Sequence, residues 1–351
     1  MPRVIGIDPG TVSIDVCGLA DGAVLLERSW PTAEVSADPS AFLATLAAAG
    51  PIDLVAGPSG YGLPLVRAET VSDEDLRLAF LAPAGERAGI MGLRSLVRDL
   101  VAAGMPTVLL PGVIHLDTVP PHRKLNRVDL GTADKLCSAA LGIHDQAGRL
   151  GGRPSDAAFI LLELGGAFTA AVAVQDGQVV DGIGGTGGPI GWQAAGALDG
   201  EVAFLAGEVT KSLLFHGGVT TIAGGRPERM GVAFDAFIEG AVKAVRQLQT
   251  SAPLASEVLV SGRLGGDPAV RDRLAEALRD VAPVRALAGY AAVAKQGAQG
   301  AALLADGLAG GSHFELVETL RLRAASGTVL DWLHVVTPDE ARRRIGLGPT
   351  G

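Results

Sequence analysis

The stretch VIGIDPGTVSIDV, residues 4–16, decides the fold. An apolar strand ends at Asp8, a turn around Gly10 follows, and a second apolar run comes next. A turn with few side chains lets backbone N–H groups approach an anion, and a strand-tip carboxylate can hold Mg²⁺ through water. We therefore expect Gly10 and Thr11 to contact phosphate and Asp8 to serve the metal or the attacking hydroxyl. A tight turn capped by the aspartate is the alternative.

The same pattern returns 155 residues further along the chain, where Glu163 and Gly165 take the places of Asp8 and Gly10. In both copies an Asp-Gly pair follows 13 residues after the acid. This pair is a strong hairpin signal because both central residues of the turn need positive φ. Each half is therefore predicted to begin with a three-stranded antiparallel meander, and the repeat predicts two similar lobes that face each other.

Helices and strands alternate after each meander. We expect helices at 39–50, 92–104, 131–148, 231–249, 267–278 and 289–310, and strands at 52–57, 106–112 and 256–262. Thr132 is the expected N-cap of the third helix. Asp267 followed by Pro268 is a strong start signal, because aspartate accepts backbone N–H bonds and proline suits the first helical position.

A chain of 351 residues exceeds one ordinary core and suits two lobes. The glycine-rich stretch 148–156 is the clearest linker between them. We expect an N-terminal lobe at 1–150 and a C-terminal lobe at 151–351. The last forty or so residues form an extension of the second lobe in which helical and strand patterns alternate weakly.

The composition excludes several classes of partner. A formal net charge of −9 argues against a nucleic-acid-binding surface. Cys17 and Cys137 lie in apolar stretches, which indicates buried thiols rather than disulfides or a metal cluster. The sequence shows neither a leader pattern nor an apolar run of membrane-spanning length. We therefore expect a cytoplasmic protein that binds no nucleic acid and no membrane.

A third glycine element, VLVSGRLGGDP, combines a buried strand, a loop and a helix start at residues 258–268. Gly262, Gly265 and Gly266, with Arg263, would let an adenine and ribose lie flat against the backbone. The helix N-terminus would offer free N–H groups. An ordinary strand-to-helix loop is the alternative.

Basic residues precede the helix expected from residue 131, and phosphoryl transfer needs positive charge on the transferred group. Arg127 and Lys135 flank the start of that helix, so they are the preferred candidates. Arg123 and Lys124 are expected in a solvated loop. Asp134 either orients an acceptor or a metal-bound water, or is an acid favoured by the helix dipole.

Two further segments contain candidate residues. The loop at 56–64 follows a buried strand, and its Ser59 and Tyr61 either line an acceptor pocket or belong to a plain turn. Lys211 and His216 lie near no glycine loop, and a lone histidine beside apolar residues is more often structural than catalytic.

These elements resemble the acetate and sugar kinase, Hsp70 and actin superfamily. The matching stretches are GIDPGT (6–11), LELGGAFT (162–169), VLVSGRLGG (258–266), TADKLCSAAL (132–141) and AAVAKQGAQGAALLADG (291–307). The resemblance implies an α/β actin-like ATPase fold with duplicated ribonuclease-H-like lobes around an interlobe nucleotide cleft. It implies ATP and Mg²⁺ as ligands. Gly10, Thr11, Gly165 and Gly166 would hold phosphates, Gly262, Arg263, Gly265 and Gly266 adenosine, and Asp8 and Glu163 the metal.

Within that superfamily the chain is most similar to proteins labelled as predicted butyrate kinases. The segment 181–200, with Gly187, stands where acyl-carboxylate kinases have a segment at the cleft. This resemblance implies phosphoryl transfer from ATP to a small carboxylate, and a homodimer by analogy. Two features depart from established short-chain acyl kinases, which usually have asparagine in place of Asp8 and an arginine in the cleft segment.

Two other functions remain open. An ATP-driven switch would use the same nucleotide site without kinase chemistry, although a reductase activator with an iron–sulfur cluster needs more cysteines than Cys17 and Cys137. The stretch GIDPG also resembles the start of Holliday-junction resolvases. The net negative charge and the second and third glycine loops count against a nuclease.

Overall fold

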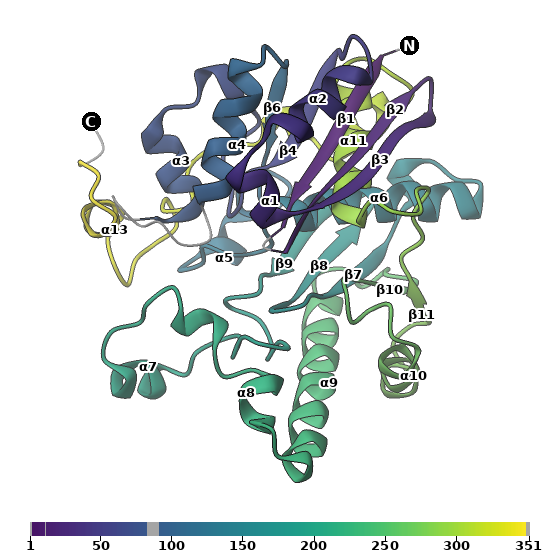
Figure 1. The fold of residues 1–351 in the computed structure, drawn as a ribbon. Helices are drawn as coiled ribbons and strands as arrows, with labels where there is room; N and C mark the ends of the chain where they lie inside the picture. The colour runs from purple at the N-terminus through teal and green to yellow at the C-terminus, as the bar shows by residue number, and fades with distance from the viewer. Residues whose placement is uncertain (1, 11, 83–90, 349–351) are drawn as a thin grey trace.

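The computed structural model describes residues 2–10, 12–82 and 91–348, so Thr11 lies outside the described residues. The chain folds into two α/β lobes, each built on a mixed sheet (Figure 1). In Figure 1 the first sheet stands above the second, and helices α6 and α11 lie where the lobes meet. The predicted two-lobed α/β architecture is confirmed.

The two sheets share one topology. The first contains β1 (Arg3–Pro9), β2 (Ser13–Ala20), β3 (Ala23–Pro31), β4 (Leu54–Pro58), β5 (Val66–Arg67) and β6 (Thr107–Leu110), in the order β3-β2-β1-β4-β6-β5. The second contains β7 (Phe159–Leu164), β8 (Thr169–Gln175), β9 (Gln178–Ile183), β10 (Val258–Ser261) and β11 (Val284–Ala286), in the order β11-β10-β7-β8-β9. Each begins with an antiparallel meander, and two parallel strands then extend it. The first sheet adds β5 at its edge.

The duplication extends to local irregularities. Asp21 and Asp176 have φ of 55° and 52°, and the glycine after each also has positive φ, as the predicted hairpin turns require. The pairing register slips after Gly18 in the first meander and after Ala173 in the second. These two slips are again 155 residues apart. A matching bulge is a feature that chance similarity of composition would not produce.

Helices cover the outer faces of the sheets and fill the space between them. The N-terminal half contains α1 (Thr32–Ala37), α2 (Ser40–Ala48), α3 (Asp73–Phe80), α4 (Met91–Ala102), α5 (Pro121–Lys124) and α6 (Ala133–Leu150). The C-terminal half contains α7 (Gly200–Ala206), α8 (Val219–Ala223), α9 (Pro227–Gln249), α10 (Pro268–Ala277), α11 (Gln296–Leu308), α12 (Phe314–Thr319) and α13 (Pro338–Arg344). No helix of the described chain is both long enough and apolar enough to span a bilayer.

Each of the six predicted helices is present, with shifted ends. Thr132 and Asp267 are N-caps as expected, and the Asp267 side chain accepts from the N–H of Ala269. Helix α6 continues to Leu150 and ends at Gly151, whose φ of 67° is a common helix terminator. The expected linker at 148–156 is therefore partly helical. Helix α11 begins later than predicted, because residues 289–295 are not helical.

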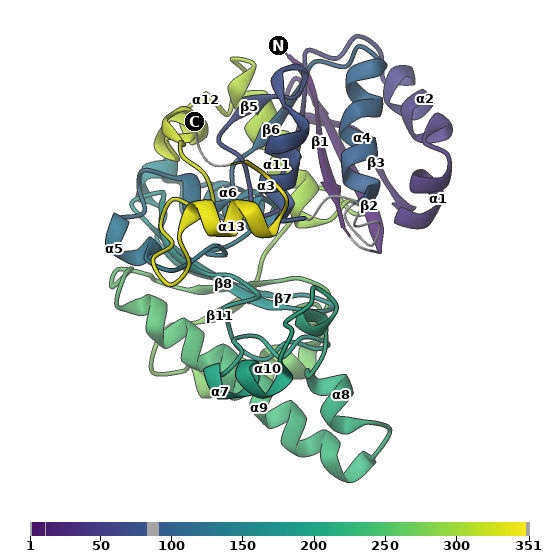
Figure 2. The ribbon, with the colours of Figure 1, turned by 90° about the vertical axis from the view of Figure 1, so that its left-hand side faces the viewer.

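Alternation along the strands builds three apolar layers. Inward residues of β1, β2 and β7, such as Val4, Cys17 and Leu161, form the central core with α6 and α11. Outward residues of β1 pack under α2 and α4, on the outer side of the first sheet (Figure 2). Outward residues of β7 pack against α9 and α10. Side chains alternate between the two faces of a strand. Since Val4 and Leu161 face inward, Asp8 and Glu163, which lie an even number of residues further along, face inward as well.

The two central helices cross at very short range. A Cβ added to Gly300 of α11 would stand 1.8 Å from the carbonyl oxygen of Cys137 in α6. A Cβ added to Gly6 would stand 2.2 Å from the backbone nitrogen of Ala302. The small residues expected in these helices are therefore required by backbone contact. Cys17 and Cys137 are free and buried, as predicted.

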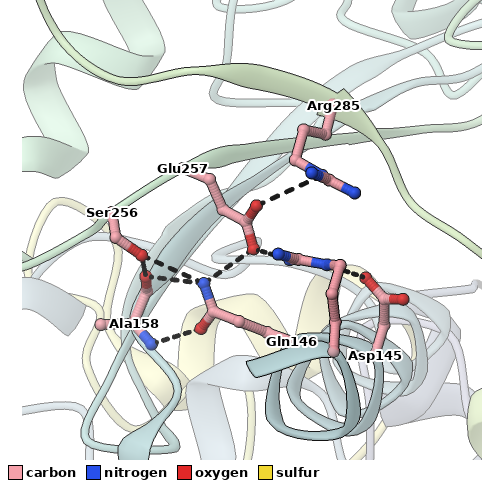
Figure 3. Close-up of polar contacts among 7 residues, drawn as sticks. Asp145, Gln146, Ala158, Ser256, Glu257 and Arg285 are labelled. Atoms are coloured by element: carbon pink, nitrogen blue, oxygen red, sulfur yellow. Dashed lines mark hydrogen bonds and ion pairs between the residues drawn. The ribbon is translucent and has the colours of Figure 1, made fainter. Parts of the chain in front are cut away.

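The C-terminal end of α6 is anchored to the second sheet (Figure 3). Glu257, which is 5% exposed, accepts from Gln146 at 2.7 Å and pairs with Arg149 and Arg285. Gln146 Oε1 in turn accepts from the N–H of Ala158 at 2.7 Å. A buried carboxylate satisfied by two guanidiniums and an amide fixes the geometry of this end of the helix.

Helix α11 belongs to the C-terminal half of the chain but packs on β1, β2 and β4 of the first sheet. The last forty residues fold as short helices, and no strand follows Ala286 in the part of the chain that the structure describes. Leu316, Leu320 and Leu322 of this extension enter the central core. The division at residue 150 stays a prediction.

Candidate active site

Asp8 and Glu163 occupy equivalent strand ends and face the N-termini of α11 and α6. A Cβ at Gly297, in the first turn of α11, would stand 2.7 Å from Asp8 Oδ2. The pKa of Asp8 is raised to about 7, because burial and the charges of Asp134 and Glu163 together outweigh the opposing charges of Lys295 and Lys135. Asp8 is thus a carboxylate whose charged form needs a nearby cation.

Lys135, in the first turn of α6, contacts two carboxylates, those of Asp134 and Glu163. Its Nζ is 2.5 Å from Asp134 Oδ2 and 2.9 Å from Glu163 Oε1. Burial lowers the pKa of Lys135, but Asp134 and Glu163 outweigh burial and raise it overall. Burial raises the pKa of Glu163. The pKa of Asp134 is lowered, because the charge of Lys135 and hydrogen bonds to the carboxylate outweigh the effect of burial. Lys135 is therefore a permanent cation held by two carboxylates.

Lys295 forms a second cationic centre that the sequence reasoning missed. Its Nζ donates to Ser13 Oγ at 2.6 Å and lies 3.1 Å from Asp15 Oδ2. Asp15 is buried, with its side chain 2% exposed, whereas the side chain of Lys295 is 45% exposed. Lys295 Nζ also lies 3.3 Å from where a Cβ would stand at Gly10. The sequence features that could have indicated this centre are an acid at an inward position of β2 and a lysine directly before α11.

The first two glycine loops close in the same way. Gly10 N–H donates to the Ser13 carbonyl at 2.9 Å, and Gly165 N–H donates to the Phe168 carbonyl at 2.9 Å. In both, an added Cβ would stand 2.9 Å from that same carbonyl oxygen. At Gly166 an added Cβ would meet only Arg263 Cδ, at 3.9 Å. Gly10 and Gly165 therefore have equivalent surroundings, and the second loop has an open face at Gly166.

The third loop packs directly on the second. Gly262 has a φ of 81°, and an added Cβ would stand 2.6 Å from the Leu164 carbonyl oxygen. Leu264 N–H donates to that same oxygen at 2.9 Å. An added Cβ at Gly265 would stand 2.3 Å from the Ser261 carbonyl oxygen, whereas at Gly266 the nearest atom is a carbonyl oxygen at 3.4 Å. Gly165, Gly166, Gly262, Arg263, Gly265 and Gly266 are thus brought together.

The segment after β9 covers the second loop. A Cβ at Gly191 would stand 2.2 Å from the Ala167 carbonyl oxygen. Asp129, which is buried, accepts from the N–H and hydroxyl of Thr186 at 3.1 and 3.0 Å. At Gly187 the nearest atom to an added Cβ is Arg127 Nη1, at 3.9 Å. Arg127 is exposed and so supplies, from another part of the chain, a guanidinium that this segment lacks.

The structure separates the two acceptor candidates. Ser59 is buried, donates to the Leu110 carbonyl at 2.7 Å and accepts from the N–H of Leu63, so its hydroxyl organises the turn. Tyr61 is partly buried, and Lys211 Nζ lies 5.2 Å from its ring centroid. Burial and the charge of Asp129 raise the pKa of Tyr61. Lys211 comes from the second lobe, which makes this contact an interlobe one.

The solvated loop expected for Arg123 and Lys124 is wrong. Lys124 is 5% exposed, its Nζ donates to the Leu116 carbonyl at 2.7 Å, and Trp332 covers it at 5.3 Å. Arg123 donates to the Val180 carbonyl at 2.6 Å. The C-terminal extension supplies Trp332, and a sequence pattern around residue 124 contains no sign of it. Both cations are structural.

A metal would find its ligands in the acidic group around Lys135. Among the described residues no three His, Cys, Asp or Glu side chains converge as a protein-only metal centre. Mg²⁺ bound with nucleotide commonly uses one or two carboxylates plus phosphate oxygens and water. The partly buried carboxylate of Asp8, with its raised pKa, fits that role. Glu163 already accepts from Lys135 at 2.9 Å.

Structural comparison identifies the fold. The fold matches a propionate kinase from Francisella tularensis subsp. tularensis SCHU S4, with a TM-score of 0.62 and 14% identity over 86% of this chain and 98% of that one. It matches acetate kinases from Entamoeba histolytica (TM-score 0.58, 12% identity, 80% and 87% covered) and Porphyromonas gingivalis (0.56, 15%, 78% and 86%). At these identities the likeness shows the fold alone, which is the two-lobed fold of the acetate and sugar kinase, Hsp70 and actin superfamily.

The family is shown by the sequence. Residues 6–335 match the family model DUF1464, described as a protein of unknown function, and the chain belongs to that family. No curated protein matches the chain.

Proposed function

We propose that the protein transfers a phosphoryl group from ATP to a small carboxylate, as a short-chain acyl kinase of the butyrate kinase type. One observation carries the proposal: two glycine turns closed by the same hydrogen bond, at Gly10 and Gly165, follow Asp8 and Glu163, the inward acids that face the N-termini of α11 and α6. Backbone N–H groups and helix N-termini together favour a polyphosphate. The fold shared with acetate and propionate kinases supports the same chemistry.

In this proposal the glycine turns hold the nucleotide. Gly10, Thr11, Gly165 and Gly166 take the phosphates. The third loop, formed by Gly262, Arg263, Gly265 and Gly266, takes the adenosine. Its contact with the second loop, through Leu264 and Leu164, would fix the position of the adenosine site relative to the phosphate site.

Asp8 and Glu163 are the proposed metal-binding residues. Bound Mg²⁺ would neutralise phosphate charge and thereby ease transfer of the γ-phosphoryl group. Asp8 would hold the ion, directly or through water, because none of the described residues gives its carboxylate a cationic contact comparable to the 2.9 Å contact between Lys135 and Glu163. Glu163 would act through water while Lys135 fixes its position.

Lys135 and Lys295 have different proposed roles. Lys135 is already held between Asp134 and Glu163, so we assign it a positioning role. Lys295 is half exposed, is held by Asp15 and lies beside Gly10, so it is the cation best placed to contact phosphate. This assignment moves the phosphate contact from Lys135, as first expected, to Lys295.

The acceptor would lie between the first lobe and the segment after β9. Arg127 beside Gly187 would bind the carboxylate, and Tyr61 with Lys211 would form the opposite wall. A carboxylate oxygen then attacks the γ-phosphorus, the bond to the β-phosphate oxygen breaks, and ADP leaves. A carboxylate acceptor carries no proton at neutral pH, so the step needs no general base.

The test is ATP turnover with defined acceptors. The full-length protein with MgATP should release ADP on addition of acetate, propionate or butyrate, and hydroxylamine should trap the acyl phosphate. The hydroxyl compounds glycerol and glucose serve as negative controls. Turnover that ignores every acid, or that only a partner protein stimulates, would instead support a nucleotide switch. Arg127→Ala should raise KM for the acid, whereas the exposed Arg279→Ala should not.

We also propose a cytoplasmic location. Cys17 and Cys137 are buried and unpaired, as suits a reducing compartment.

A further inference from the structure

A cavity of about 300 Å³ lies at the edge of the first sheet opposite the candidate active site. Strands β4 and β6 run parallel with β1, and the cavity is lined by Leu54 and Val108 near their first residues. Asp8 lies near the other end of β1. Leu308 and Ala309, at the C-terminal end of α11, close one side. This edge, with β5 and β6, is visible in Figure 2.

The lining combines an apolar body with a charged end. The apolar side chains are Leu54, Leu65, Val66, Val108, Leu308 and Ala309. The charged side chains are Asp53, Arg67 and Arg323. Small-molecule sites typically have volumes of about 300–1,000 Å³, so this one suits a small ligand with an apolar part.

The positive charges are incompletely matched. Across residues 2–10, 12–82 and 91–348 the Arg67 side chain makes no hydrogen bond or ion pair. The contacts of Arg323 within that same part of the chain are long, 3.4 Å to the Leu308 carbonyl and 3.5 Å to Glu318. Asp53 already accepts from the backbone N–H of Arg3 at 2.7 Å. Arg67 and Arg323 are both exposed, so water serves their free guanidinium donors, and an anionic ligand in the cavity would replace that water with charge-assisted hydrogen bonds.

We propose that this cavity binds a monocarboxylate with an apolar chain, at a site separate from the one that binds nucleotide. The carboxylate would pair with Arg67, with Arg323 as a second donor, and the chain would lie against Leu65 and Leu308. A planar guanidinium matches a carboxylate in two parallel hydrogen bonds. The carboxylate of Asp53 in the same lining disfavours a dianion such as a phosphate monoester.

Two measurements on the nucleotide-free full-length protein test the proposal. Crystals soaked with 6-bromohexanoate should show an anomalous bromine peak in the cavity. Calorimetry with hexanoate should show binding that Arg67→Ala weakens about tenfold or more, as loss of a charge-assisted pair implies. Arg67→Lys should recover part of it, and 1-hexanol should bind more weakly than hexanoate.

The controls separate this site from the active site. Arg273→Ala removes an exposed guanidinium on α10 that pairs with Asp235, and it should leave hexanoate binding unchanged. Leu65→Phe narrows the cavity and should weaken binding without touching a charge. A bromine peak only beside Asp8, or equal hexanoate affinity in wild type and Arg67→Ala, would overturn the proposal while leaving the proposed kinase activity standing.

Discussion

The carboxylate of Asp8 lies 2.7 Å from the point at which a Cβ would stand on Gly297. Gly297→Ala should therefore push the Asp8 side chain away and lower ATP turnover at least about tenfold, since misplaced catalytic groups cost orders of magnitude. Stability should change by less than about 1 kcal/mol, because alanine favours the helix and a carboxylate end can rotate. Turnover assays and thermal melts measure the two effects.

Gly231→Ala is the matched control for that change. Gly231 also lies in a helix, α9, and an added Cβ there meets no atom within 4 Å. It should keep full turnover. Equal turnover in both variants would show that Asp8 need not occupy its observed position.

The raised pKa of Asp8 predicts a pH-dependent stability. With a native pKa of about 7 against 3.8 as the ordinary value, the native state binds more protons than the unfolded state between those pH values. The contribution of this group to stability is therefore present at low pH and is lost as pH rises towards 7. Asp8→Asn should stabilise the protein by about 1–3 kcal/mol at pH 8 and by much less at pH 4.5.

Urea unfolding at the two pH values measures this difference, with the exposed Asp272→Asn as control. Asp8→Asn should also abolish the stabilisation of the wild type by MgATP. A stabilisation that is the same at pH 4.5 and pH 8 would contradict the assigned shift.

The sequence predicted the parts of the site that local pattern determines. Asp8 and Glu163 were paired through the 155-residue repeat, and period-two alternation is enough to turn both inward. The turns at Asp21 and Asp176 followed from φ preferences alone.

The rest depends on contacts between distant segments. Lys295 reaches Ser13 across 282 residues, and nothing near either residue specifies that approach. Trp332 covers Lys124 for the same reason, which is why a solvated loop was the wrong expectation there. The helices of the C-terminal extension are too short for a reliable apolar period, so only their packing in the central core defines them.

Replacing the two lysines should give different results. Lys135→Ala leaves Asp134 and Glu163 without their shared cation in a largely buried place and should cost about 2–4 kcal/mol of stability. Lys295→Ala removes the cation that pairs with the buried carboxylate of Asp15, so it should cost about 1–3 kcal/mol of stability, and it should in addition raise KM for ATP. Lys295→Arg should restore part of the affinity. Lys243→Ala, on the exposed face of α9, should change neither quantity.

Gly300 makes the crossing of α6 and α11 highly sensitive to an added side chain. A Cβ at this position would stand 1.8 Å from the Cys137 carbonyl oxygen, and neither backbone can yield without moving a whole helix. Gly300→Ala should cost about 2–3 kcal/mol, as overpacking in a core does, and should also lower turnover because α6 carries Lys135 and α11 follows Lys295. Gly148→Ala, where an added Cβ of α6 meets no atom within 4 Å, should be neutral or stabilising. Urea unfolding that shows the same stability for both variants would mean that the two helices are further apart than the structure places them.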